Sequence, residues 1–197
     1  MQNEFAFPDQ FNGYTRIEYM SVFISFLYAL VISEFFVGWG RMIRTRSNII
    51  FSVDHLIYSI LYFWILLLNW WSLWVRMAFL GDGFLYFILI IIPLALSYFA
   101  TVLMFPDLDK EYDLPNYFDR NFKIIGISLS LFIMVNLLVG IWLGEKIGSG
   151  SMPAFIRFIN SVLIFVVAFF DLKKLRRLFA IIIGIALLFG SIQIAFV

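Results

Sequence analysis

The chain has 197 residues, of which 63% are hydrophobic and 14% are charged, and its mean hydropathy is +0.96. Since soluble domains carry roughly 25% charged residues, this composition excludes a soluble globular protein and predicts an integral membrane protein. The net charge of +1 gives no indication of a nucleic-acid partner, and the lack of cysteine excludes disulfides and thiolate metal sites. The first twelve residues are polar and contain Pro8, so we expect no cleaved signal peptide.

Long apolar segments recur along the chain and are joined by polar connections. At about 1.5 Å per helical residue, about 20 residues cross the roughly 30 Å hydrocarbon core of a bilayer. We therefore predict an all-α fold, a polytopic transmembrane bundle of about six helices that forms a single domain over residues 1–197. The predicted spans are 17–40, 53–77, 83–104, 122–143, 154–171 and 178–197. The longest connection, 106–120, contains two prolines and several acids, and we interpret it as a partly helical interfacial loop.

Basic residues are distributed unequally between the two ends of the predicted spans. Ten of the fourteen lie near the first, third and fifth connections: Arg41, Arg44, Arg46, Lys110, Arg120, Lys123, Lys173, Lys174, Arg176 and Arg177. The other four are Arg16, Arg76, Lys146 and Arg157. Because cytoplasmic connections carry an excess of Lys and Arg, we expect the basic connections, including the 106–120 loop, in the cytoplasm. Both termini would then be extracytoplasmic, with the protein in the inner (cytoplasmic) membrane.

Polar residues inside the first two spans form stripes at helical spacing. On the first span they fill an arc of about 140° and are Glu18, Ser21, Ser25, Tyr28, Ala29 and Ser33. On the second span they fill an arc of about 100° and are His55, Tyr58, Ser59, Tyr62, Asn69 and Arg76. Polar side chains in hydrocarbon are costly unless they face another helix or water. An antiparallel hairpin sets Asn69 at the depth of Ser25, so we expect the two stripes to face each other.

The later spans repeat this pattern more faintly. On the fifth span an arc of about 100° holds Arg157, Asn160, Ser161, Ala168 and Asp171, which predicts a face that points into the protein. The sixth span has small residues on one side, namely Ala180, Gly184, Ser191 and Ala195, which allow close helix packing. Helix packing accounts for both faces, and a polar pathway is the alternative. We expect Asn136, alone on the fourth span, to make an interhelical hydrogen bond.

Glu34 lies about 160° around the first helix from Glu18 and requires a partner of its own. The candidate partners are Arg41, His55 or a residue of another helix or subunit, and the alternative is a carboxylate that reaches the headgroups. Since His55 is predicted at a similar depth on the next helix, Glu34 and His55 would form a charged pair that gates a pathway. In the other interpretation, Glu34 and His55 do not interact, and each independently anchors its own helix at the membrane interface.

Motifs for catalysis and cofactor binding are mostly absent from the chain. One histidine cannot supply bis-histidine haem ligation or a two-histidine metal site, and the glycines in 144–150 do not form a phosphate-binding loop. The acids near the third connection, Asp107, Asp109, Glu111 and Asp113, would suit a divalent cation, but acids beside prolines are more often a solvated loop. We therefore predict no enzyme activity, no catalytic residue, no cofactor and no metal.

Several short motifs occur together in residues 17–123. They are Glu18-Tyr19-x-Ser21, Gly38-x-Gly40-Arg41, His55-Leu56, Asn69-Trp70-Trp71, Phe105-Pro106-Asp107, Asp113-Leu114 and Tyr117-Phe118. As a set they resemble a family of small, uncharacterised bacterial multi-pass membrane proteins. That family often has His at the position of Glu34 and Gln at that of Asn69, so this chain departs from it at both candidate positions. The resemblance implies several membrane helices and implies no activity.

Three functions are compatible with these patterns. The first is a small channel or small-solute or ion transporter, whose pathway follows the polar stripes of the first, second and fifth spans and which assembles as a homo-oligomer. Its candidate pathway or gate residues are Glu18, Ser21, Ser25, Glu34, His55, Tyr58, Tyr62, Asn69, Arg157 and Asn160. The second is an accessory or effector protein of a cytoplasmic defence or signalling system, whose protein partner binds the basic turns and the 106–120 loop. The third is a membrane-embedded enzyme that acts on lipid.

Overall fold

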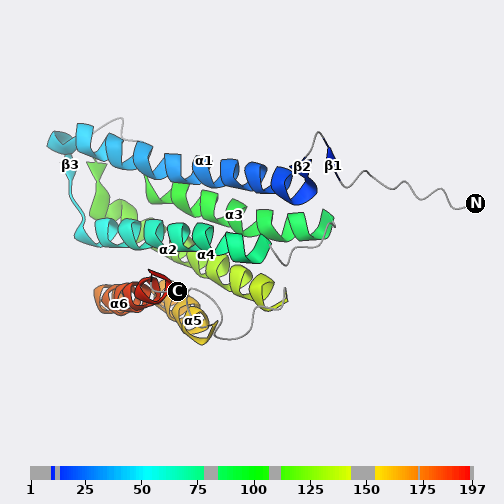
Figure 1. Ribbon diagram of the computed structural model, residues 1–197. Helices are drawn as coiled ribbons and strands as arrows, with labels where there is room; N and C mark the ends of the chain where they lie inside the picture. Colours follow the sequence, from blue (N-terminus) through cyan, green and yellow to red (C-terminus); the bar gives the residue numbers. More distant parts are fainter. Residues whose placement is uncertain are drawn as a thin grey trace, which may run out of the picture.

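The structure is a computed structural model, and it describes residues 10–11, 14–77, 84–106, 112–142, 154–172 and 174–195. Its helices are α1 (Arg16–Arg44), α2 (Val53–Met77), α3 (Phe84–Met104), α4 (Leu114–Trp142), α5 (Ala154–Phe169) and α6 (Arg176–Ala195). Figure 1 shows α1 on one side of the bundle and α5 and α6 on the other, with α2, α3 and α4 between them. The predicted all-α class is therefore confirmed.

The remaining elements are short and lie in the connections. A 3-10 helix, Arg46–Asn48, follows α1, and the strands are β1 (Gln10–Phe11), β2 (Tyr14–Thr15), β3 (Ile49–Ile50) and β4 (Tyr112–Asp113). β1 pairs with β2 in antiparallel, and β3 pairs with β4 in parallel. The second pair joins the first connection to the third, 63 residues later in the chain, since Ile50 lies opposite Asp113 and Ile49 opposite Tyr112.

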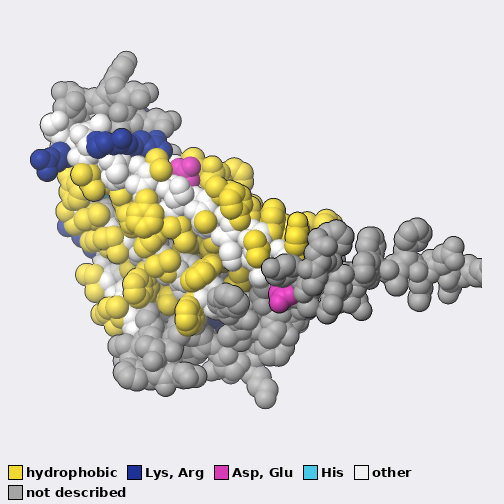
Figure 2. Space-filling model, turned by 45° about the horizontal axis from the view of Figure 1, so that its top comes forward, with side chains coloured by type: hydrophobic (Ala, Val, Ile, Leu, Met, Phe, Trp, Pro, Cys, Tyr) yellow, Lys and Arg dark blue, Asp and Glu magenta, His cyan; other side chains and the backbone are white. Residues whose placement is uncertain are grey.

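Four of the described helices are long and apolar enough to cross a membrane, over Glu18–Arg44, Val53–Leu73, Phe87–Met104 and Leu114–Trp142. Many of their apolar side chains point outward, and Figure 2 shows this apolar surface covering most of one face. Helix α5 has 16 residues and is about 24 Å long, which is shorter than the roughly 30 Å hydrocarbon core. The structure thus supports a membrane protein with four long apolar helices, and the predicted number of six spans is not confirmed.

Helix α4 is the central element of the bundle. More than half of its apolar window is buried (56%), against 22% for that of α1. It contacts α2, α3 and α5, and at about 100° per residue its buried residues cover about half of its circumference. A helix with such a wide buried face is expected to pack against several neighbours. The side chains that α4 contributes are therefore the ones that bring distant parts of the chain together.

Helix α4 also begins earlier than the predicted fourth span. The carboxylate of Asp113 accepts a hydrogen bond from the backbone N–H of Asn116 at 3.0 Å, which is the N-cap arrangement at a helix start. Residues 114–120, interpreted from the sequence as the end of a partly helical interfacial loop, are helical and form the first two turns of a continuous 29-residue helix. The acids at 107, 109 and 111 lie outside the described residues.

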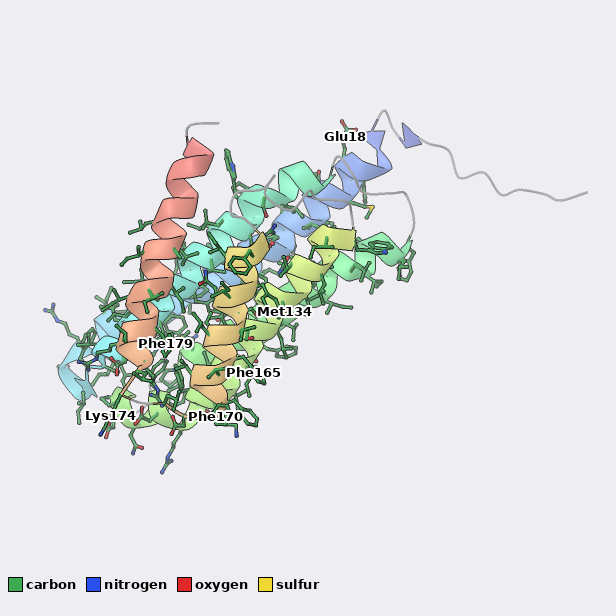
Figure 3. The ribbon with its side chains drawn as sticks, turned by 90° about the horizontal axis from the view of Figure 1, so that it is seen from below. Glu18, Met134, Phe165, Phe170, Lys174 and Phe179 are labelled. Atoms are coloured by element: carbon green, nitrogen blue, oxygen red, sulfur yellow. The ribbon has the colours of Figure 1, made fainter. Side chains whose placement is uncertain are left out.

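The three basic connections meet at one end of the molecule. Besides the β3–β4 pair, Arg177 at the start of α6 forms an ion pair with Asp54 at the start of α2. In Figure 3, Lys174 and Phe170 lie at this end and Glu18 lies at the opposite end. We call it the basic end. The first, third and fifth connections therefore lie together at one end, as predicted. Which side of the membrane this end faces stays a prediction.

Candidate functional site

A cavity of about 60 Å³ with mainly apolar walls lies between α2, α4, α5 and α6, and we call it the polar cavity after the polar side chains that converge on it. Its polar lining is Asn69, Ser72, Asn136, Arg157 and Asn160, and its apolar lining comes from Ile65, Leu68, Phe132, Ile133, Ile183 and Leu187. A cavity needs roughly 10–15 Å³ of such volume to hold a water molecule, so this one has room for water or for a small solute. Three of the residues predicted from the sequence, Asn69, Arg157 and Asn160, are brought together here.

Helical spacing explains why these side chains converge. Asn69 and Ser72 on α2, and Arg157 and Asn160 on α5, are each three residues apart, so both members of a pair lie on one helix face. The hydroxyl of Ser72 donates to the backbone carbonyl of Asn69 at 2.8 Å. On α4, the amide of Asn136 donates to the carbonyl of Phe132 at 2.8 Å. Asn136 thus bonds within its own helix and lies in the cavity wall, and its interhelical hydrogen bond stays a prediction.

Asn69 connects the cavity to α1. Its Oδ1 accepts a hydrogen bond from the hydroxyl of Tyr28, a residue of the predicted stripe on the first span. The sequence sets Asn69 at the depth of Ser25, and Tyr28 lies about one turn further along α1. The longer side chain of tyrosine reaches across the helix interface where a serine does not.

The position of α5 is set by a tight seam with α4. The hydroxyl of Ser130 donates to the carbonyl of Ser161 at 2.9 Å, and the hydroxyl of Ser161 donates to the carbonyl of Ser130 at the same distance. A Cβ atom added to Gly126 would overlap the side chain of Ala168, so the two helices approach closely at that point. The predicted inward face of the fifth span is indeed buried at Asn160, Ser161 and Ala168. This seam holds Arg157 and Asn160 beside α4.

The other half of the α2 stripe is packed and dry. His55 and Tyr62 are completely buried, and Tyr58 is 5% exposed. Each uses a backbone carbonyl as its partner: Met104 for His55 Nε2 at 2.8 Å, Arg176 for Tyr58 at 3.0 Å and Ser97 for Tyr62 at 2.6 Å. These bonds engage both tyrosine hydroxyls and Nε2 of His55 and stabilise helix packing, while Nδ1 of His55 is buried without a hydrogen-bond partner among the described residues. These three predicted site residues therefore do not line the cavity.

The predicted pair between Glu34 and His55 is not present. Glu34 lies 3.9 Å from Arg41, one of the partners considered above, and both side chains are about one-third exposed. The ring of His55 packs against Phe105, whose ring also fills the space beside Gly38 on α1. Judged only by position along the two helices, His55 on α2 would lie close to Gly38 on α1. In the structure, Phe105, which follows α3, lies between them.

The predicted stripe on α1 is only partly directed inward. Its buried side is mainly apolar and consists of Ile24, Tyr28, Val31, Phe35 and Met42. Glu18, Ala29 and Ser33 are exposed, and Ser21 and Ser25 are half-buried. The hydroxyl of Ser21 donates to the carbonyl of Glu18 at 2.7 Å, within its own helix. Of the α1 stripe, Tyr28 is the residue that contacts a polar side chain lining the cavity.

A second polar cluster, at the basic end, was not anticipated. Arg176 is 1% exposed, and its guanidinium binds the carboxylates of Asp119 and Asp171 and lies 3.9 Å from the ring centre of Phe122. Asp171 has a left-handed backbone (φ 48°) just beyond α5, and the N–H of Leu172 donates to the carbonyl of Val167 at 3.2 Å, as in a Schellman helix end. In the sequence, Arg176 is one of four basic residues in a single connection, and its buried position depends on Asp119, which lies 57 residues earlier in the chain.

The described residues contain no group of three or more His, Asp or Glu side chains that could hold a metal ion. The polar cavity instead presents one guanidinium, three amides and one hydroxyl. A guanidinium has five N–H donors and no acceptor, while an amide offers both. This set of groups is suited to a small anion or a small neutral polar solute.

Comparison with protein-family models, with curated proteins and with solved structures found no match for this chain. The resemblance to a bacterial membrane-protein family is not supported by these comparisons. The function must therefore be inferred from the geometry of the molecule.

Proposed function

We propose that this protein is a membrane channel or transporter for a small anion, which it binds in the polar cavity between α2, α4, α5 and α6. The observation that carries the proposal is the position of Arg157, whose Nε atom is buried and whose side chain shares the cavity with three asparagines. Arg157 lies in the first turn of α5, and its side chain lines the cavity. Ionisable residues of membrane helices commonly face a water-filled cavity or a functional pathway.

The size of the cavity restricts the solute. A volume of about 60 Å³ accommodates a halide ion or a carboxylate as small as formate with few water molecules. The amides of Asn69, Asn136 and Asn160 supply donors for the remaining sides of such an anion. The apolar side chains around them exclude bulk water, which strengthens the attraction of the guanidinium for a negative charge.

Passage through the membrane requires a route from the cavity to the basic end. Phe132, which lines the cavity, packs against Tyr62 with 6.3 Å between ring centres, and Tyr62 is completely buried. Transport therefore needs a movement of helices that separates these rings, or an assembly in which several chains share a pathway. The exposure of Ala29 and Ser33 on the outer side of α1 supports a homo-oligomer, because small residues permit close helix association.

Uptake by proteoliposomes tests the proposal. We expect the wild-type protein to admit chloride or formate, measured by stopped-flow light scattering, and Arg157→Gln to reduce that uptake at least tenfold. Arg120→Gln, on the exposed side of α4, is the matched control and should leave uptake unchanged. Equal uptake by wild type and Arg157→Gln would overturn the proposed site.

Accessibility of the cavity to water gives an independent test. The chain has no cysteine, so a single introduced thiol reports on one position. Ser72→Cys should react with a water-soluble methanethiosulfonate reagent, whereas Ser97→Cys, in the dry half of the bundle, should not. If Ser72→Cys is as unreactive as Ser97→Cys, the cavity is dry and the transport proposal fails. An accessory protein that binds a partner at the basic end is then the remaining prediction.

A further inference from the structure

A groove of about 600 Å³ lies at the basic end, where α1 meets the start of α2. Its base includes Met42 and Leu114, which are buried, and its walls include Ile43, Phe51 and Ile60, which are each at least half exposed. The volume falls within the range of about 300–1,000 Å³ that is typical of ligand pockets. The groove is separate from the polar cavity and shares no lining residue with it.

The apolar walls are held open by fixed elements. The indole N–H of Trp39, which also lines the groove, donates to the hydroxyl of Ser59 at 3.2 Å, so the ring cannot turn into the space. The β3–β4 pair holds Ile49 at one side of the groove, and Leu114 begins α4 beneath it. The space is therefore preformed, with walls that present apolar side chains to an apolar occupant.

Positive charge accompanies this apolar space. Among the described lining residues, Arg46 is the charged one, and Arg44, two residues earlier, is also exposed. The segment 41–52 contains three arginines and no acid. Arg41 is paired with Glu34, whereas Arg44 and Arg46 are exposed. Figure 2 shows Lys and Arg side chains gathered directly beside the apolar surface at this end.

We propose that this groove binds one anionic phospholipid, with an acyl chain against Ile43, Phe51 and Ile60 and the phosphate at Arg44 and Arg46. The groove lies at the end of a helix that is long enough to cross the membrane, where headgroups and the first part of the acyl chains are found. Basic pockets at such positions bind the headgroups of anionic lipids. A lipid supplies both an apolar chain and an adjacent negative charge, which is the combination that the groove presents.

Native mass spectrometry of the full chain in detergent tests this binding. Phosphatidylglycerol and phosphatidylcholine with identical chains are added in turn, and we expect one tightly retained phosphatidylglycerol per chain. Arg46→Gln should lower the preference for phosphatidylglycerol about fivefold, because a basic residue near the surface is worth about that factor. Lys174→Gln, an exposed change at the same end and outside the groove, is the matched control and should leave the preference unchanged.

A second variant separates the contribution of the acyl chain to lipid binding from that of the phosphate charge. Ile60→Trp fills the groove without altering its charge and should reduce retention of both lipids, while an unchanged melting temperature shows that the fold persists. Equal retention of the two lipids by the wild type would overturn the proposal. Displacement of the lipid by millimolar inorganic phosphate would also overturn it, because that result indicates a site for free phosphate. So would protection of the Ile43→Cys thiol from labelling by a co-purifying protein instead of by lipid.

Discussion

The hydroxyl of Tyr28 on α1 donates a hydrogen bond to Oδ1 of Asn69 on α2, 41 residues later in the chain. This bond joins the two polar stripes of the first hairpin at the edge of the polar cavity. It also fixes which side of the Asn69 amide points toward α1, because a hydroxyl donor selects the carbonyl oxygen. The Nδ2 donor of Asn69 is thus directed away from the Tyr28 hydroxyl.

Removal of this bond should weaken the contact between α1 and α2. Since interhelical hydrogen bonds in membranes contribute about 0.6–2 kcal/mol, we expect Tyr28→Phe and Asn69→Leu each to lower the free energy of unfolding by that amount. The double variant should lose less than the sum, because both changes remove one interaction. Steric trapping in bicelles measures these differences. Additive losses would show that the two residues act separately.

Two glycines provide a test of the α4–α5 seam. Gly126→Ala should destabilise the protein, because the new methyl group would overlap Ala168 and force α5 away from α4. Gly40→Ala, on α1, meets no atom within 4 Å and should stabilise its helix by up to about 1 kcal/mol. Thermal unfolding in detergent compares them. Shifts of the same sign would contradict the close approach at Gly126.

The cluster around Arg176 should matter more for stability than the neighbouring surface pair. Arg176→Gln removes the buried partner of Asp119 and Asp171, whose side chains are 41% and 50% exposed, and we expect a loss of about 1.5–3 kcal/mol. The matched control is Arg177→Gln, whose side chain is 65% exposed and pairs with Asp54. It should cost at most about 1 kcal/mol, and that cost should decrease with added salt. Equal losses of unfolding free energy in the two variants would mean that the burial of Arg176 contributes nothing to stability.

Single-cysteine labelling in sealed membranes tests the topology. Cysteines introduced at Asn116 and Lys174, which are exposed at the basic end, should react only from the cytoplasmic side. Cysteine at Tyr19, 73% exposed near the opposite end of α1, should react only from outside. Labelling of Asn116→Cys from outside would reverse the orientation. Labelling of the 116 and 174 positions from different sides would contradict the shared basic end.

The amino-acid sequence by itself determined the class of fold and most of the helix positions. Apolar runs of about 20 residues have few alternatives to a membrane helix, because a bilayer offers backbone groups no other hydrogen-bond partner. The sequence also indicated that Asn69, Arg157 and Asn160 face the interior, since helical periodicity places polar residues on one side. It misplaced the start of α4, because the capping role of Asp113 is a local contact hidden among other acids.

Only the tertiary structure decided which polar residues are dry and which line a cavity. His55 and Tyr62 belong to the same stripe as Asn69, but their Nε2 atom and hydroxyl bond carbonyls of α3, whereas Asn69 lies where α4, α5 and α6 leave a space. The partners of Arg176 include Asp119, 57 residues away, and Phe105 occupies the place where Glu34 and His55 would have met. Periodicity states the direction in which a side chain points from its own helix, and packing against the other helices determines what it meets there.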